Sequence, residues 1–149
     1  MHIKRKIHTA YLKIINSKIL ILQQTLADLK ESGSNETKST AGDKHETALA
    51  MLQIEQANTR AQLQAAIELH SILIIINPAV HSINILPGSY IKTDKGNFYL
   101  SVALGKIEIA GETVTAISPQ SPLGAKLIGR KVKDTVSING IEFLINSIE

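Results

Sequence analysis

The sequence predicts an α+β protein in which an antiparallel helical coiled-coil hairpin precedes a small antiparallel β domain. Two observations predict the hairpin: apolar residues recur three and four positions apart in two long segments, and a short polar stretch separates these segments. A third observation predicts the β domain. Beyond Asn77-Pro78, and clearly from Ser89, apolar and polar residues alternate as they do in strands. We therefore expect a coiled-coil arm over residues 1–76, a linker over 77–88 and a β domain over 89–149.

The first helix is expected to run from about Ile7 to Glu31. Its apolar residues have the spacing of a coiled-coil seam, and no Gly or Pro interrupts them. The seam consists of Leu12, Ile15, Ile19, Leu22, Leu26 and Leu29, and Ile14 and Ile21 broaden it. Gly33 can adopt the left-handed conformation that ends many helices, so we expect residues 32–42 to form a polar connector. The cluster Lys4-Arg5-Lys6 could contact an acidic partner or nucleic acid, but we expect it to be a frayed basic end.

A second helix is expected from about Asp43 to Ile75. It keeps the same spacing, with polar members in its middle, at Leu49, Leu52, Gln56, Thr59, Leu63, Ala66 and Leu73. Its many alanines favour a helix and allow a partner to approach closely. Because only about ten residues separate the two amphipathic helices, we expect them to pair antiparallel with each other.

Residues 89–149 carry the turn signals and the alternation of an antiparallel sheet. Strands are expected at residues 90–93, 98–104, 106–110, 113–117, 136–138 and 141–145. The last two are joined by Asn139-Gly140, the strongest short sequence signal for a hairpin turn. One short helix is expected from Pro122 to Leu127, with Ser121 as its N-cap and Pro122 at its first position.

Composition excludes several classes of site. The 149 residues contain no Cys, so neither disulfides nor thiolate metal sites can hold the chain together. Three Tyr, two Phe and no Trp are too few for an aromatic-lined ligand pocket or a base-stacking platform. A formal net charge of +3 is only mildly basic. There is no Ser/His/Asp arrangement, no glycine-rich phosphate loop and no apolar run long enough to span a membrane, so we expect a cytoplasmic monomer without an autonomous catalytic centre.

The candidate chemistry lies at Asp43 and Glu46. A spacing of three on a helix puts both carboxylates on one face. Such a pair can hold Mg²⁺, which prefers carboxylates, waters and phosphate oxygens. The same residues at the N-cap and at the third helical position also form a capping-box arrangement, and the two roles are compatible.

Two blocks of the sequence resemble the GreA/GreB family of bacterial transcription elongation factors, which stimulate transcript cleavage. The first block is similar to the family's recurring C-terminal pattern and consists of Ser121, Pro122, Leu123, Gly124, Leu127, Ile128, Gly129, Arg130 and Lys131. This resemblance implies a β domain with a fold similar to FK506-binding proteins (FKBP-like), which docks at the rim of the secondary channel of RNA polymerase. The residues implied to bind the polymerase are Ser121, Pro122, Leu123, Gly124, Arg130 and Lys131.

The second block is similar to the family's tip motif and reads Gly42-Asp43-Lys44-His45-Glu46-Thr47-Ala48. The resemblance implies that Asp43 and Glu46 are the catalytic acids and share a transient Mg²⁺ with the polymerase active centre. Nascent RNA would then be cut near its 3′ end. On this interpretation the chain is an accessory factor rather than an enzyme, and it has no cofactor of its own.

Three other interpretations stay open at this point. The chain could be a polymerase-channel regulator that does not stimulate cleavage. It could be a coiled-coil interaction module, if the seam were open to another chain. It could be a prolyl isomerase of the FK506-binding type, although the scarcity of aromatic residues after residue 88 argues against the lined pocket that such an enzyme needs.

Overall fold

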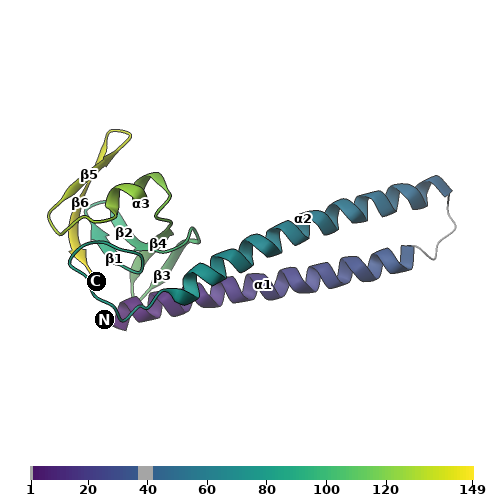
Figure 1. Cartoon of the computed structure of the whole chain (residues 1–149), viewed down its shortest axis with the longest axis horizontal. Coiled ribbons are helices and arrows are strands. Elements are labelled where there is room, and N and C mark those ends of the chain that lie inside the picture. Colours follow the sequence, from purple (N-terminus) through teal and green to yellow (C-terminus); the bar gives the residue numbers. More distant parts are fainter. Residues whose placement is uncertain (1, 37–41) are drawn as a thin grey trace. The chain divides into compact units, whose positions relative to one another are not determined.

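The structure is a computed structural model that describes residues 2–36 and 42–149 (Figure 1). Two long helices come first, and strands with one short helix follow, which confirms the predicted α+β class. The elements are α1 (His2–Glu36), α2 (Gly42–Ile75), β1 (Tyr90–Thr93), β2 (Gly96–Leu100), β3 (Gly105–Ile109), β4 (Glu112–Ile117), α3 (Pro122–Leu127), β5 (Thr135–Ile138) and β6 (Ile141–Ile148). Among the described helices, none combines the length and the apolar character that crossing a membrane requires.

The contacts of the chain divide it into two units. The arm unit is Ile14–His70, and the β unit contains the residues up to Lys13 together with Ser71–Glu149. Both the start of α1 and the end of α2 have their contacts in the β unit. Helix α1 therefore contributes to both units.

In the arm unit, α1 and α2 lie side by side and run in opposite directions (Figure 1). The seam predicted from the spacing is the buried side of the pair: Ile15, Leu22, Thr59 and Ala66 are all less than 9% exposed. Ile21, which we expected to broaden the seam, is 66% exposed. The helices therefore bury a narrow stripe against each other, as a two-stranded coiled coil does.

The expected end of α1 was wrong. The helix continues through Ser32 to Glu36, and Gly33 is helical. Gly33 lies four residues after Leu29, at the next seam position, where a Cβ atom would lie 3.4 Å from Gln56 Nε2. Gln56 Nε2 donates a hydrogen bond to Leu29 O at 3.1 Å. Gly33 is therefore not a left-handed cap, and a Cβ atom there would be in ordinary van der Waals contact with the flexible Gln56 side chain.

The expected frayed basic end was also wrong. Helix α1 begins at His2, and Lys4 is only 2% exposed. Lys4 Nζ donates a hydrogen bond to Val80 O at 2.6 Å. Burial lowers the pKa of Lys4, and the charge of Glu149 opposes this shift. The first turns of α1 are therefore held firmly in the β unit, with Arg5 and Lys6 left exposed.

The strands form a sheet in the order β3-β4-β2-β1-β6-β5. All neighbours are antiparallel except β2 and β4, which are parallel with Phe98 opposite Thr115. The purely antiparallel sheet expected from the sequence is thus wrong at this pair. Residues 101–104 carry the chain away from β2 before the β3–β4 hairpin, so the returning strand β4 runs in the same direction as β2.

The core of the β unit lies between the sheet and α3. Its buried members are Ile85, Ile91, Leu100, Leu127, Val136 and Ile145, and Ile117, Leu123, Phe143 and Ile148 pack against them. The turn between β5 and β6 has positive φ values of 52° at Asn139 and 78° at Gly140. This is the two-residue hairpin geometry predicted from these residues.

We expect Leu22→Ala to destabilise the arm unit by about 2–4 kcal/mol, because it removes a side chain that is 8% exposed from the seam and leaves a cavity. Leu20→Ala is the matched control, since Leu20 is 67% exposed on the same helix and should change stability by less than about 0.5 kcal/mol. Urea denaturation followed by circular dichroism measures both values. Equal effects of the two substitutions would contradict the assigned seam.

Candidate functional site

The first candidate site is the start of α2. The helix begins at Gly42, so Asp43 and Glu46 both belong to its first turn. The carboxylate of Glu46 is exposed, whereas the side chain of Asp43 lies outside the described residues. Two carboxylates supply at most part of the six-oxygen shell that Mg²⁺ requires. The donor set therefore fits an ion shared with water and a partner, and does not fit a complete cage.

The second candidate site is the block around α3, which begins with a cap. Ser121 Oγ accepts a hydrogen bond from Gly124 N at 3.1 Å and donates one to Ser118 O at 2.6 Å. Pro122 follows at the first helical position and is exposed. The predicted N-cap is confirmed, because Ser121 satisfies a backbone donor that the helix itself cannot pair.

Gly124 has a steric role in the same turn. A Cβ atom at this position would lie 2.0 Å from Ser118 O and 2.8 Å from Ser121 Oγ. The neighbouring Leu123 packs against the core of the β unit. Three of the residues expected to bind a partner, Ser121, Leu123 and Gly124, thus hold the turn together and position the exposed Pro122.

The Leu-Ile-Gly part of the block joins the linker to the β unit. Leu127 is fully buried in the core. Gly129, at a φ of 80°, donates its N–H to Ile85 O at 2.7 Å, and Ile85 N–H donates to Arg130 O at 2.8 Å. Asn84 Nδ2 donates to Gly129 O at 3.0 Å. A residue with a Cβ atom would be strained at Gly129, so the glycine allows this paired connection.

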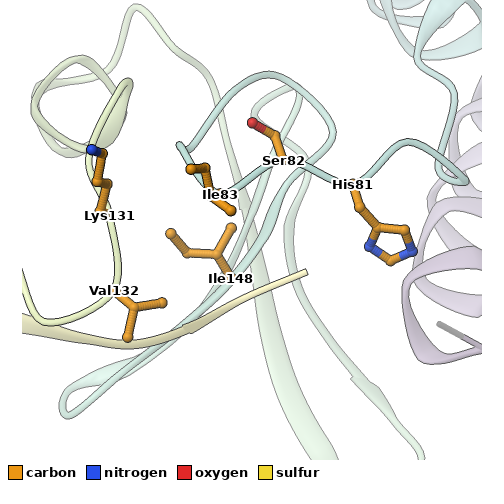
Figure 2. Close-up of a pocket in the computed structure, with 6 residues that line it drawn as sticks. All are labelled: His81, Ser82, Ile83, Lys131, Val132 and Ile148. Atoms are coloured by element: carbon orange, nitrogen blue, oxygen red, sulfur yellow. The ribbon is translucent and has the colours of Figure 1, made fainter.

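Arg130 and Lys131 are the exposed end of the block. Lys131 lines a pocket of about 450 Å³ together with Ile83, Val132 and Ile148. Figure 2 shows the three apolar side chains gathered together, while the Lys131 ammonium group points away from them. Ile83 is 78% exposed. This surface offers an apolar contact beside a cation, and it adjoins the residues implied to bind a partner.

The sequence did not predict a polar cluster where α1 meets the sheet. His8 Nδ1 and Tyr99 Oη lie 2.7 Å apart in a hydrogen bond, and the rings of Tyr11 and Tyr99 stack with centroids 6.2 Å apart. The single hydroxyl hydrogen of Tyr11 is shared between Gly105 O, 2.7 Å from Oη, and Val114 O, 3.1 Å from Oη. One feature of the sequence could have predicted the cluster. Tyr11 carries a hydroxyl group and lies among aliphatic residues of the first helix, so a buried Tyr11 would need a hydrogen-bond partner.

Burial keeps this cluster uncharged. It raises the pKa of Tyr11 to about 12, against the opposing effect of a backbone hydrogen bond at Ala116, and it also raises the pKa of Tyr99. Burial lowers the pKa of His8. All three groups are therefore neutral near pH 7, so the cluster attaches α1 to the sheet rather than supplying acid–base chemistry.

A second polar cluster spans β1 and β4. Glu112 accepts hydrogen bonds from Tyr90 Oη at 2.6 Å and from Lys92 Nζ at 2.7 Å. The hydrogen bond from Lys92, followed by that from Tyr90, lowers the pKa of Glu112. Burial, followed by the interaction with Glu112, raises the pKa of Tyr90. These three side chains satisfy one another, and their arrangement is typical of a structural ion pair.

Comparison with known proteins adds little. Neither a protein-family model nor a curated protein sequence matches the chain. A solved structure described as that of the transcription factor Gfh1 is similar with a TM-score of 0.39 and 16% sequence identity, over 92% of each chain. A likeness this weak establishes neither a shared fold nor a shared function.

We expect Gly124→Ala to destabilise the β unit by about 3 kcal/mol or more, because its Cβ atom would lie only 2.0 Å from a backbone oxygen, Ser118 O. Gly111→Ala is the control, since an added Cβ there meets nothing within 4 Å and costs only the strain of a left-handed residue, about 1–2 kcal/mol. Thermal unfolding compares the two variants. A Gly124→Ala protein as stable as the wild type would show that α3 shifts freely, contrary to the structure.

We expect Glu112→Gln to lower the free energy of unfolding by about 0.5–1 kcal/mol at pH 7, since the ion pair is partly exposed. The folded-state pKa of Glu112 lies below its unfolded value of about 4.3, so its contribution is present above that value and is lost as the pH falls through the folded pKa. Urea unfolding at pH 7 and pH 3 should show the difference from wild type shrinking in acid. Glu142→Gln, at an exposed carboxylate on β6, is the control and should show no such trend.

Proposed function

We propose that this chain is a Gre-like transcription elongation factor that binds RNA polymerase through its secondary channel and modulates elongation. One observation carries the proposal: a helical arm whose second helix begins with an acidic pair, and a β unit built around the Ser121-to-Lys131 block, occur in one chain. Each half alone has an ordinary structural explanation. Their combination has the organisation of the family that the sequence resembles.

The arm suits entry into a channel. Residues 14–36 of α1 belong to the arm unit, and these 23 residues at ~1.5 Å per residue give about 35 Å. Two paired helices are narrow for their length, and the acidic pair belongs to the first turn of α2, directly after the connector between the helices. Asp43 and Glu46 would thus carry negative charge and oxygen donors into the polymerase active centre. When bound there, Mg²⁺ would supply the charge that activates water for phosphodiester cleavage.

The β unit would supply the docking area. Of the residues implied to bind the polymerase, Pro122, Arg130 and Lys131 are exposed and can touch a partner. Ser121, Leu123 and Gly124 act through them as positioning residues, because they fix the turn from which Pro122 projects. Docking and chemistry would thus depend on different parts of the chain.

A non-cleaving polymerase-channel regulator is the second candidate. The observation that favours it is the presence of Lys44 and His45 between the two acids. A cation next to a carboxylate pair competes with a metal ion for the same negative charge. The coiled-coil interaction module loses support, because the seam of the described arm is buried between its own helices.

We expect Asp43→Asn with Glu46→Gln to abolish stimulated cleavage in a backtracked elongation complex while polymerase binding changes by less than about twofold, because the carboxylates supply the metal and the β unit supplies the docking area. Asn caps a helix about as well as Asp, so the stability of the arm should scarcely change. Glu55→Gln, at an exposed acid further along α2, is the matched control.

Two outcomes decide between the candidates. A wild-type protein that binds polymerase but never promotes cleavage over a range of Mg²⁺ concentrations supports the non-cleaving regulator. A wild-type protein that does not bind polymerase at all contradicts both candidates.

A further inference from the structure

Strand β3 is an edge of the sheet, and no other strand of residues 2–36 and 42–149 pairs with its outer side. The turn between β3 and β4 has positive φ values of 51° at Ala110 and 79° at Gly111, so Ile109 and Glu112 close a two-residue hairpin as a hydrogen-bonded pair. Hydrogen-bonded and non-hydrogen-bonded pairs alternate along an antiparallel ladder. The N–H and C=O groups of Lys106 and Glu108 therefore point away from β4.

These groups have no partner in the part of the chain that the structure describes. No strand lies beyond β3, and no backbone hydrogen bond from a turn or loop reaches Lys106 or Glu108. An exposed edge of this kind is a template for the addition of another strand. Two residues of an incoming extended segment could pair with these four groups.

A groove runs between this edge strand and α1. It has a volume of about 460 Å³ and is lined by Arg5, Lys6, Thr9, Ala10, Lys13 and Ile109. The hydrogen bond from Tyr11 Oη to Gly105 O attaches α1 to the start of β3, and Ile109 at the end of the strand lines the groove. The helix thus borders β3 at both ends of the strand.

The charges of the groove select the partner. Arg5, Lys6 and Lys13 are exposed, and among the described lining residues there is no carboxylate. Glu108 lies on β3 but, by the alternation of a strand, faces the side opposite to Ile109. A segment added to this edge would therefore meet positive charge on the side of the sheet that α1 covers.

The spacing of Arg5 and Lys13 matches that of an extended chain. These two cations are eight residues apart along the helix, which is about 12 Å, and the uncharged Thr9 lies midway between them. Side chains on one face of a strand recur every second residue, about 6.8 Å apart. Acidic side chains at the first and third of three such positions, about 13.6 Å apart, can therefore face Arg5 and Lys13.

We infer that this groove binds an extended, acidic segment of a partner protein, which adds to the edge of β3 and directs alternate carboxylates toward Arg5, Lys6 and Lys13. The inference does not depend on the proposed function, because it uses neither the start of α2 nor the block around α3. Nucleic acid is the competing occupant, since phosphates also attract cations, but it would leave the strand edge unused.

The test is a titration of the full chain, labelled with ¹⁵N, with the capped pentapeptide acetyl-Asp-Thr-Asp-Thr-Asp-amide. We expect the amide signals of Lys106 and Glu108 to shift. Arg5→Glu with Lys13→Glu should weaken binding by about tenfold or more. Lys18→Glu with Lys30→Glu makes the same charge change at exposed sites further along α1 and should leave the affinity within about twofold.

Pairing of the peptide backbone with β3 can be tested separately from the attraction between charges. Glu108→Pro removes the outward N–H without touching the ladder to β4, and proline is tolerated at such edge positions. It should weaken peptide binding by about fivefold to tenfold with little change in melting temperature. A peptide N-methylated at both Thr residues keeps its charge but loses two backbone N–H donors. It should bind the wild-type protein more weakly by a similar factor. This second test does not depend on whether Glu108→Pro folds.

Three results would overturn the inference. One is the absence of shifts at Lys106 and Glu108 up to millimolar peptide. Another is equal binding of the N-methylated peptide, which would reduce the contact to charge alone. The third is a single-stranded oligouridylate that displaces the peptide and binds Glu108→Pro as tightly as wild type, which would assign the groove to nucleic acid. None of these results involves polymerase, so the proposed function is tested separately.

Discussion

The attachment of the first turns of α1 to the sheet is the interaction on which the rest of the structure depends. Tyr11 satisfies two backbone carbonyl groups, of Gly105 and Val114, and stacks on Tyr99. Ile7 is fully buried, and burial of such a side chain contributes about 1.5–3 kcal/mol. Because α1 continues from this attachment into the arm unit, one helix supplies both a layer of the β unit and half of the coiled-coil seam.

The same attachment explains how basic residues on one helix come to have different roles. Lys4 is buried and its ammonium group bonds to Val80 O, whereas Arg5, Lys6 and Lys13 lie at the surface. A rigid helix fixes the spacing of these exposed cations, since the buried side cannot rotate without breaking the contacts of Tyr11. Recognition by charge is sharper on such a preorganised surface than on a frayed end, because fewer side chains and no backbone need to be ordered on binding.

Patterns of neighbouring residues predicted the helices and strands. They did not predict contacts between residues that are far apart in the sequence. The seam, the Ser121 cap and the Asn139-Gly140 turn each depend on residues a few positions apart, and all are confirmed. The bond between His8 and Tyr99 joins residues 91 positions apart, and the parallel pairing of β2 with β4 depends on the path of the chain. Gly33 misled the prediction because a glycine can end a helix in the left-handed conformation but does not have to, and here the helix continues through it.

The candidate site was likewise predictable only where neighbouring residues determine it. The spacing of Asp43 and Glu46 placed both acids in one helical turn, and the structure starts α2 at Gly42. Within the α3 block, however, residue type alone could not separate contact from support. Ser121 and Gly124 are fixed by a cap and by a backbone atom at 2.0 Å, so their presence follows from folding whether or not a partner binds. Among the residues implied to bind the polymerase, direct contact therefore belongs to the exposed Pro122, Arg130 and Lys131. A substitution that disrupts the turn would remove docking by Pro122 and stability together.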